Sequence, residues 1–239
     1  MNIRWPARIL ISVIVLSGCV TLAYATRTWS SAEYLRFVSL LVLTVCASRL
    51  KLSLPGVTGN MSMNLPFILI STAVLGFSQA VVIAFVATLV QSLPQGLRKI
   101  RSVQTMFNVS VVVVSVAVAE LILAMHGRRL STMLLVAGAA YLLTNTVPVA
   151  AIIALTERLS ALKTWYNIFR LSFPYYVLGA TIAVAVLGIA QLTSWFVPLS
   201  VLPVMFFIYR SYKLYFSGLA SQSAALQHVR AKAMGAAAH

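Results

Sequence analysis

The chain has 239 residues, of which 61% are hydrophobic and only 9% are charged. Soluble domains carry about 25% charged residues, so this composition excludes an ordinary water-soluble globular domain. The net charge is +15, but the basic residues lie mainly in turns between apolar runs, a pattern typical of membrane proteins and not of nucleic-acid binders.

Apolar runs follow one another along almost the whole chain. A helix needs about 20 apolar residues to cross a bilayer. The runs are 9–25, 34–48, 63–77, 79–93, 105–125, 133–155, 171–192 and 196–212. They predict an all-α fold, a polytopic helical bundle of seven or eight transmembrane helices within residues 1–216. Residues 63–93 have a second interpretation as a re-entrant pair, because Gly76-Phe77-Ser78-Gln79 favours a tight helical hairpin.

The basic residues predict the orientation of the bundle. With the N-terminus in the cytoplasm and an even number of spans, 14 of the 18 Lys and Arg residues lie inside. The four that lie outside are Arg27, Arg36, Arg128 and Arg129. Loops rich in Lys and Arg stay in the cytoplasm, so both termini are expected there. The first run has a rival interpretation as a cleaved leader, because Ala23-Tyr24-Ala25 is a small-x-small pattern.

Polar residues inside apolar runs are the candidate ligand or cavity residues. Glu120 is the one acid within such a run, and a charged carboxylate in hydrocarbon costs at least ~2.5 kcal/mol. It is either a proton, cation or ligand site, or a group that reaches water or pairs with Arg128 or Arg129. Asn108 lies twelve residues earlier, about 120° away around the helix, and is expected to bond a neighbouring helix.

Two punctuated stretches add further candidates. Pro148, in Thr144-Asn145-Thr146-Val147-Pro148, is expected to interrupt the sixth run, and Asn145 would then line a polar cavity unless the kink serves packing alone. Residues 54–66 hold the densest Pro, Gly and Asn content in the chain. They predict either a loop that dips into the membrane and presents Ser62 and Asn64 to a cavity, or a plain cytoplasmic turn.

Aromatic residues near the ends of the later runs are expected to be interfacial anchors: Trp165, Tyr175, Tyr176 and Trp195. Residues 157–170 mix basic and apolar side chains, which predicts an amphipathic segment on the inner leaflet. Residues 217–239 predict a short cytoplasmic helical tail. Tyr212, at the end of the last run, and Leu219, Leu226 and Ala233 in the tail recur every seven residues, which suggests pairing with another helix.

Four stretches in order resemble a family of bacterial multi-pass membrane sensor domains that precede HD-GYP phosphodiesterase or GGDEF cyclase domains. They are Ser48-Arg49-Leu50-Lys51 through Leu54-Pro55-Gly56-Val57-Thr58-Gly59 to Asn64; Asn145-Thr146-Val147-Pro148 through Ala154-Leu155-Thr156-Glu157; Phe173-Pro174-Tyr175-Tyr176; and Tyr209-Arg210-Ser211-Tyr212-Lys213-Leu214-Tyr215. The resemblance implies an input module in the bacterial inner membrane whose last helix leads to a cytoplasmic output. No HD, GYP, GGDEF or EAL sequence follows Phe216, so no catalytic activity is implied.

These patterns favour a non-catalytic membrane sensor that passes a stimulus to a cytoplasmic partner through its C-terminal helix. The alternative is a small transporter or a substrate-binding transporter subunit. Neither needs a cofactor, and the three histidines are not spaced as metal ligands. The expected partners are the lipid bilayer and, at the C-terminal helix, a signalling protein or a second copy of the chain, with no nucleic acid.

Overall fold

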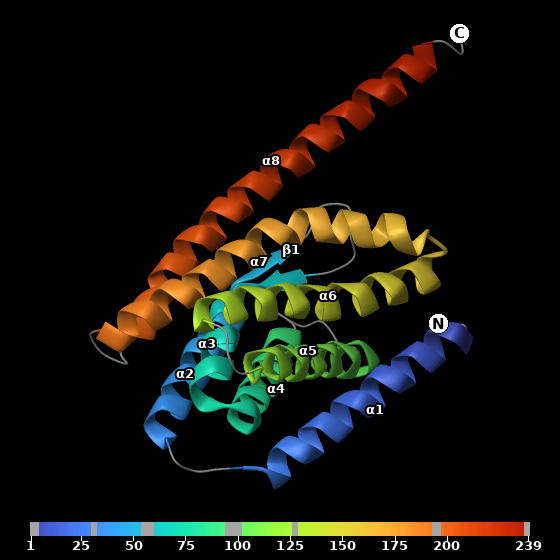
Figure 1. Ribbon diagram of the computed structural model, residues 1–239. Coiled ribbons are helices and arrows are strands. Elements are labelled where there is room, and N and C mark those ends of the chain that lie inside the picture. Colours follow the sequence, from blue (N-terminus) through green and yellow to red (C-terminus); the bar gives the residue numbers. More distant parts are fainter. Residues whose placement is uncertain are drawn as a thin grey trace.

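The computed structural model describes residues 5–29, 33–53, 60–93, 102–125, 129–192 and 197–236. Within these ranges the chain forms eight α-helices, a 3₁₀ helix and a two-stranded hairpin (Figure 1). In chain order they are α1 (Trp5–Arg27), α2 (Tyr34–Ser48), β1 (Lys51–Ser53), β2 (Asn60–Ser62), α3 (Leu65–Leu75), α4 (Phe77–Ser92), α5 (Ser102–Leu123), α6 (Leu130–Glu157), α7 (Ala161–Leu192), η1 (Val197–Ser200) and α8 (Val201–Ala236). A helical bundle is therefore confirmed, with one helix in each apolar run.

The helices differ in length. In the part of the chain that the structure describes, α1, α5, α6 and residues 161–190 of α7 are long and apolar enough to cross a membrane. Helices α2, α3 and α4 have 15, 11 and 16 residues. At 1.5 Å per residue α3 is about 16 Å long, roughly half of a ~30 Å hydrocarbon core. Four helices of spanning length are shown, and seven or eight spans remain a prediction.

Helix α3 lies in the middle of the bundle. It contacts α2, α4, α5, α6 and α7, and residues Leu65 to Thr72 are all buried. A helix covered on every side has no polar face, which explains the uniform apolar run in this part of the sequence. Gly76, with a φ of 77°, is the single residue between α3 and α4. The predicted tight turn at this position is confirmed.

Small residues let three pairs of helices approach closely. A Cβ added at Gly18 of α1 would lie 2.5 Å from Ser110 Cβ of α5. A Cβ at Gly138 of α6 would lie 2.9 Å from Ala180 Cβ, and one at Gly179 of α7 would lie 2.9 Å from Leu65 Cδ2 of α3. Close backbone approach through small residues is how membrane helices gain dispersion contacts without a hydrophobic driving force.

One predicted feature of α6 is wrong, and the predicted amphipathic segment belongs mostly to a longer helix. Helix α6 is not interrupted at Pro148 but continues to Glu157, while the hydroxyl of Thr144 donates to the carbonyl of Ala140 (2.8 Å). Residues 157–170 comprise the end of α6, the turn and the start of α7, and their place on the inner leaflet stays a prediction. The chain reverses at Arg158, whose φ is 58°, and α7 starts at Ala161 as one continuous helix (Figure 1).

The hairpin and the last helix complete the fold. Strands β1 and β2 are antiparallel and pair Leu52 with Met61, and the buried side chains of these two residues join the main core. A loop without strands was expected over residues 54–66, and residues 54–59 of that loop lie outside the described ranges. Helix α8 contacts η1, β1 and α2, and its C-terminal half projects beyond the bundle (Figure 1).

Candidate functional site

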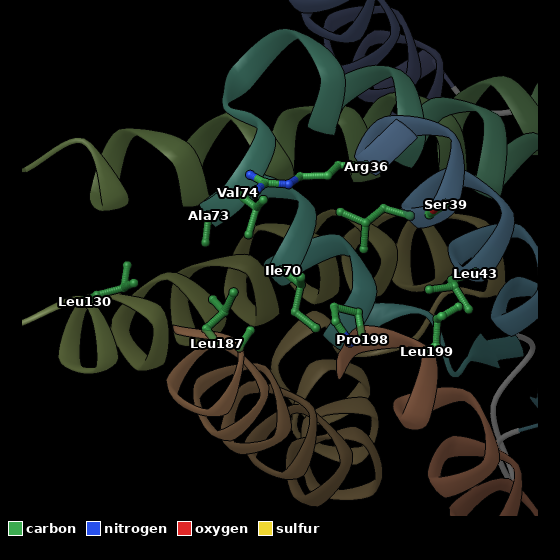
Figure 2. A pocket seen from close by; sticks show the side chains of 12 residues that line it. Arg36, Ser39, Leu43, Ile70, Ala73, Val74, Leu130, Leu187, Pro198 and Leu199 are labelled. Carbon is green, nitrogen blue, oxygen red and sulfur yellow. The ribbon is translucent and has the colours of Figure 1, made fainter. Parts of the chain in front are cut away.

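A cavity of about 230 Å³ lies where several helices end. Its walls come from the start of α2, the end of α3, the start of α6, the end of α7 and η1 (Figure 2). The lining residues are Arg36, Ser39, Leu40, Leu43, Ile70, Ala73, Val74, Leu130, Leu187, Ala190, Pro198 and Leu199. The helix directions place the cavity at the end of the bundle opposite to the α6–α7 turn.

One charged side chain reaches this cavity. Arg36 Nη1 lies 2.9 Å from both carboxylate oxygens of Glu33, three residues earlier. Figure 2 shows the guanidinium extending from α2 toward Val74, near the end of α3. A cation at the C-terminal end of a helix is favourable because the last carbonyl groups carry partial negative charge. Both side chains of the ion pair are 41% exposed, so the pair sits at the rim of the cavity.

Local packing holds this end of α2. The rings of Trp29 and Phe37 meet edge to face with centroids 5.2 Å apart. Leu40 and Leu43, on the next turn, are buried in the core. Ser39 lies three residues after Arg36, and residues three apart lie on the same face of a helix. The two polar lining residues therefore share the face of α2 that borders the cavity.

A second polar cluster surrounds the hairpin. The hydroxyl of Ser62 lies 2.9 Å from Asn64 Oδ1 and 2.9 Å from Gln91 Oε1. Lys51 Nζ donates to the carbonyl of Leu93 (2.8 Å), and Arg49 Nη1 donates to the carbonyl of Val90 (3.3 Å). Burial, and secondly the charge of Arg49, lower the pKa of Lys51. Ser62, Lys51 and Arg49 thus fasten the hairpin and the residue before it to the end of α4, whereas the side chain of Asn64 bonds to Ser62 beside it.

The other candidate residues lie apart from the cavity. Asn145 Nδ2 donates to the hydroxyl of Tyr176 (2.6 Å) and so links α6 to α7. Pro148 lies one turn further along α6 and is half-buried. Asn108 and Glu120 belong to α5, where Asn108 is half-buried. Glu120 Oε2 is buried without a hydrogen-bond partner among the described residues.

The aromatic residues predicted as interfacial anchors differ in where they lie in the structure. Tyr175 and Tyr176 are 1% and 7% exposed, so they belong to the core of the bundle and not to a lipid-facing belt. Tyr175 accepts a hydrogen bond from the backbone of Leu65 (3.0 Å). Trp165 is half-buried and donates to Thr146 Oγ1 (3.2 Å). Trp195 lies outside the described residues.

The sequence missed the cavity because it forms where residues from five separate segments meet. Arg36 stood out only as a charge at the outer end of a run, and Ser39, Ile70 and Pro198 gave no signal. The one available hint was the Glu33-Arg36 spacing, which favours an ion pair within one helical turn.

The cavity has apolar walls and one guanidinium group, that of Arg36. These groups can bind a molecule that has an apolar part and an anionic part. In the described ranges no three His, Cys, Asp or Glu side chains lie together as metal ligands. No family model, no curated protein and no solved structure matches the chain.

Proposed function

We propose that the chain is a non-catalytic integral membrane sensor, in which occupancy of the cavity changes the position of α8. The observation that carries this proposal is a direct connection in the chain. Pro198 and Leu199 of η1 line the cavity, and α8 begins two residues later at Val201. A ligand that moves η1 therefore acts on the first turn of the helix that leads to the tail.

The packing of α8 supports movement. Val201, Met205 and Phe216 are buried, but Phe207 and Leu214 are each 70% exposed. A second apolar hollow, of about 410 Å³, lies beside the contact between α2 and α8 and is lined by Cys46, Leu50, Leu202, Pro203, Phe206 and Phe207. Elements with few buried contacts move at low cost in free energy.

The charge distribution supports an output in the cytoplasm. The start of α1, the end of α2, the hairpin and the α6–α7 turn lie toward one end of the bundle (Figure 1), and these segments carry Arg8, Arg49, Lys51, Arg158 and Lys163. Arg27, Arg36 and Arg129 lie toward the end that holds the cavity. With the positive end inside, the cavity faces the outer leaflet and the tail faces a cytoplasmic partner. The resemblance to sensor domains of bacterial inner membranes agrees with this orientation.

The test measures the position of α8 with the cavity filled by a side chain. Spin labels at Leu159→Cys and Ser221→Cys, with Cys19 and Cys46 replaced by Ala, report the distance between the α6–α7 turn and the tail. Ala73→Trp fills the cavity, whereas Ala139→Trp adds the same bulk at an exposed position of α6. The proposal expects a shifted distance distribution for Ala73→Trp alone. Identical distributions for both variants and the parent would refute it.

One observation favours a small transporter as the second candidate. Helices α3 and α4 are short, meet at Gly76 and include the most buried segment of the bundle. Short or interrupted helices near the midplane are where secondary transporters hold their substrates. A transporter predicts solute flux in proteoliposomes that survives removal of residues 217–239, whereas the sensor predicts no flux.

A further inference from the structure

The residues that line the cavity at Arg36 determine what kind of molecule it accepts. Of the 12 residues that line it, ten are Leu, Ile, Val, Ala or Pro, and only Arg36 and Ser39 are polar. Apolar walls match a hydrocarbon group, whereas the polar groups of a sugar or a nucleotide would lie against them without hydrogen-bond partners. The part of the ligand inside the cavity is therefore a hydrocarbon group.

The volume limits how much hydrocarbon fits. A cavity of roughly 150 Å³ admits benzene, and pockets for drug-sized molecules start at about 300 Å³. The cavity, at about 230 Å³, lies between these values. It accepts a segment of one alkyl chain and has no room for two chains side by side.

The position of Arg36 at the rim determines the charge of the ligand's headgroup. Both bonds to Glu33 come from Nη1, so Nη2–H and Nε–H take no part in that ion pair. Two parallel N–H groups of a guanidinium match the two oxygens of a carboxylate or phosphate. The rim lies where several helices end, so a charged headgroup there stays near water while its chain enters the cavity.

We infer that this cavity binds a single-chain amphiphile with an anionic headgroup, the headgroup at Arg36 and Ser39 and the chain between Ile70, Leu187 and Pro198. The inference rests on the proposed function for its role, since the ligand would be the stimulus. Glu33 then acts as an internal competitor, because its carboxylate occupies part of the same guanidinium.

The test is a titration of the full chain in nanodiscs of zwitterionic lipid, with thermal stabilisation as the readout. The probes are dodecanoate, dodecanol and two-chain phosphatidylglycerol. Dodecanoate is expected to bind about tenfold more tightly than dodecanol, the size of one charge-assisted interaction. Equal affinity of dodecanol, or equal affinity of phosphatidylglycerol, would overturn the inference.

Four variants separate this site from general attraction to a basic protein. Arg36→Gln should abolish the preference for dodecanoate over dodecanol, and Glu33→Gln should strengthen dodecanoate binding about threefold by removing the competitor. Ala73→Trp should abolish binding of both compounds. Lys163→Gln removes one positive charge at the opposite end of the bundle and should leave the titration unchanged; a loss equal to that of Arg36→Gln would refute the site.

The two proposals fail in different ways. Dodecanoate binding without any change in the distance between the labelled residues 159 and 221 would refute the sensor and keep the ligand class. A distance change in Ala73→Trp without selective dodecanoate binding to the parent protein would refute the ligand class and keep the sensor.

Discussion

The hydroxyl of Tyr175 in α7 accepts a hydrogen bond of 3.0 Å from the backbone N–H of Leu65, the first residue of α3. The first N–H groups of a helix have no partner within the helix, and this one is buried where water cannot replace one. Tyr175 thereby fixes the start of the central helix, although it stands 110 residues away in the chain.

Replacing Tyr175 by Phe is expected to destabilise the fold by about 1–3 kcal/mol, because it leaves the Leu65 N–H buried and unpaired. Unfolding in a detergent titration measures the change. Tyr166→Phe removes the same hydroxyl from a side chain that is 57% exposed and serves as the control. Equal stability of the two variants would contradict the role of the bond.

Gly18→Ala is expected to cost about 1–3 kcal/mol by overpacking. The new Cβ would lie 2.7 Å from the Cα of Ser110, and backbone cannot turn aside as a flexible side chain can. Gly188 is also helical, with nothing within 4 Å of an added Cβ. Gly188→Ala should therefore be neutral or stabilising, and the difference between the two melting temperatures tests the α1–α5 contact.

Gly76→Ala is expected to destabilise by about 1–3 kcal/mol for a different reason. Nothing lies within 4 Å of its added Cβ, but its φ of 77° and ψ of −179° belong to a region that only Gly adopts readily. Gly218→Ala, in the interior of α8 with equally open surroundings, is the matched control. If both substitutions had the same effect on stability, the strained turn between α3 and α4 would be disproved.

The bond between Asn145 and Tyr176 should show coupling in a double-mutant cycle. Asn145→Ala, Tyr176→Phe and the double variant are compared by reversible unfolding. Hydrogen bonds between membrane helices contribute about 0.6 kcal/mol on average and up to about 1.7. The short distance of 2.6 Å places the expected coupling in the upper part of that range. Strict additivity would mean that the bond contributes nothing.

Glu120→Gln is expected to stabilise the protein, since a neutral amide costs less to bury than a carboxylate whose Oε2 lacks a partner in the described structure. Thermal unfolding measures the change. If one particular cation raised the melting temperature of the parent protein above that of Glu120→Gln, and other cations did not, the hypothesis of a cation site would be supported instead.

Much of the helix pattern could be predicted from the sequence, because long apolar runs leave few alternatives for a chain in lipid. Tyr175 and Tyr176 show the limit of that reasoning. Aromatic residues near a Pro fit an interfacial belt as well as a core, and only their partners Leu65 and Asn145, from distant segments, decide between the two.

The predictions for Pro148 and for the hairpin were wrong for two different reasons. A proline removes one hydrogen bond from a helix, but the surrounding contacts of α6 with α5 and α7 hold the helix together across it. Strands of three residues are too short to produce an alternating pattern, so β1 and β2 were indistinguishable from a loop. The cavity could not be predicted, because its prediction requires the relative positions of five segments of the chain.

The uninterrupted length of α8 makes it a lever. Its 36 residues extend about 54 Å, well beyond the ~30 Å of a hydrocarbon core. With the pivot at η1, a tilt of about 5° moves the far end by about 5 Å, the length of one helical turn. In the proposed sensor, a small displacement at Pro198 therefore becomes a movement of about 5 Å at Ala236, which is the output that a partner would read.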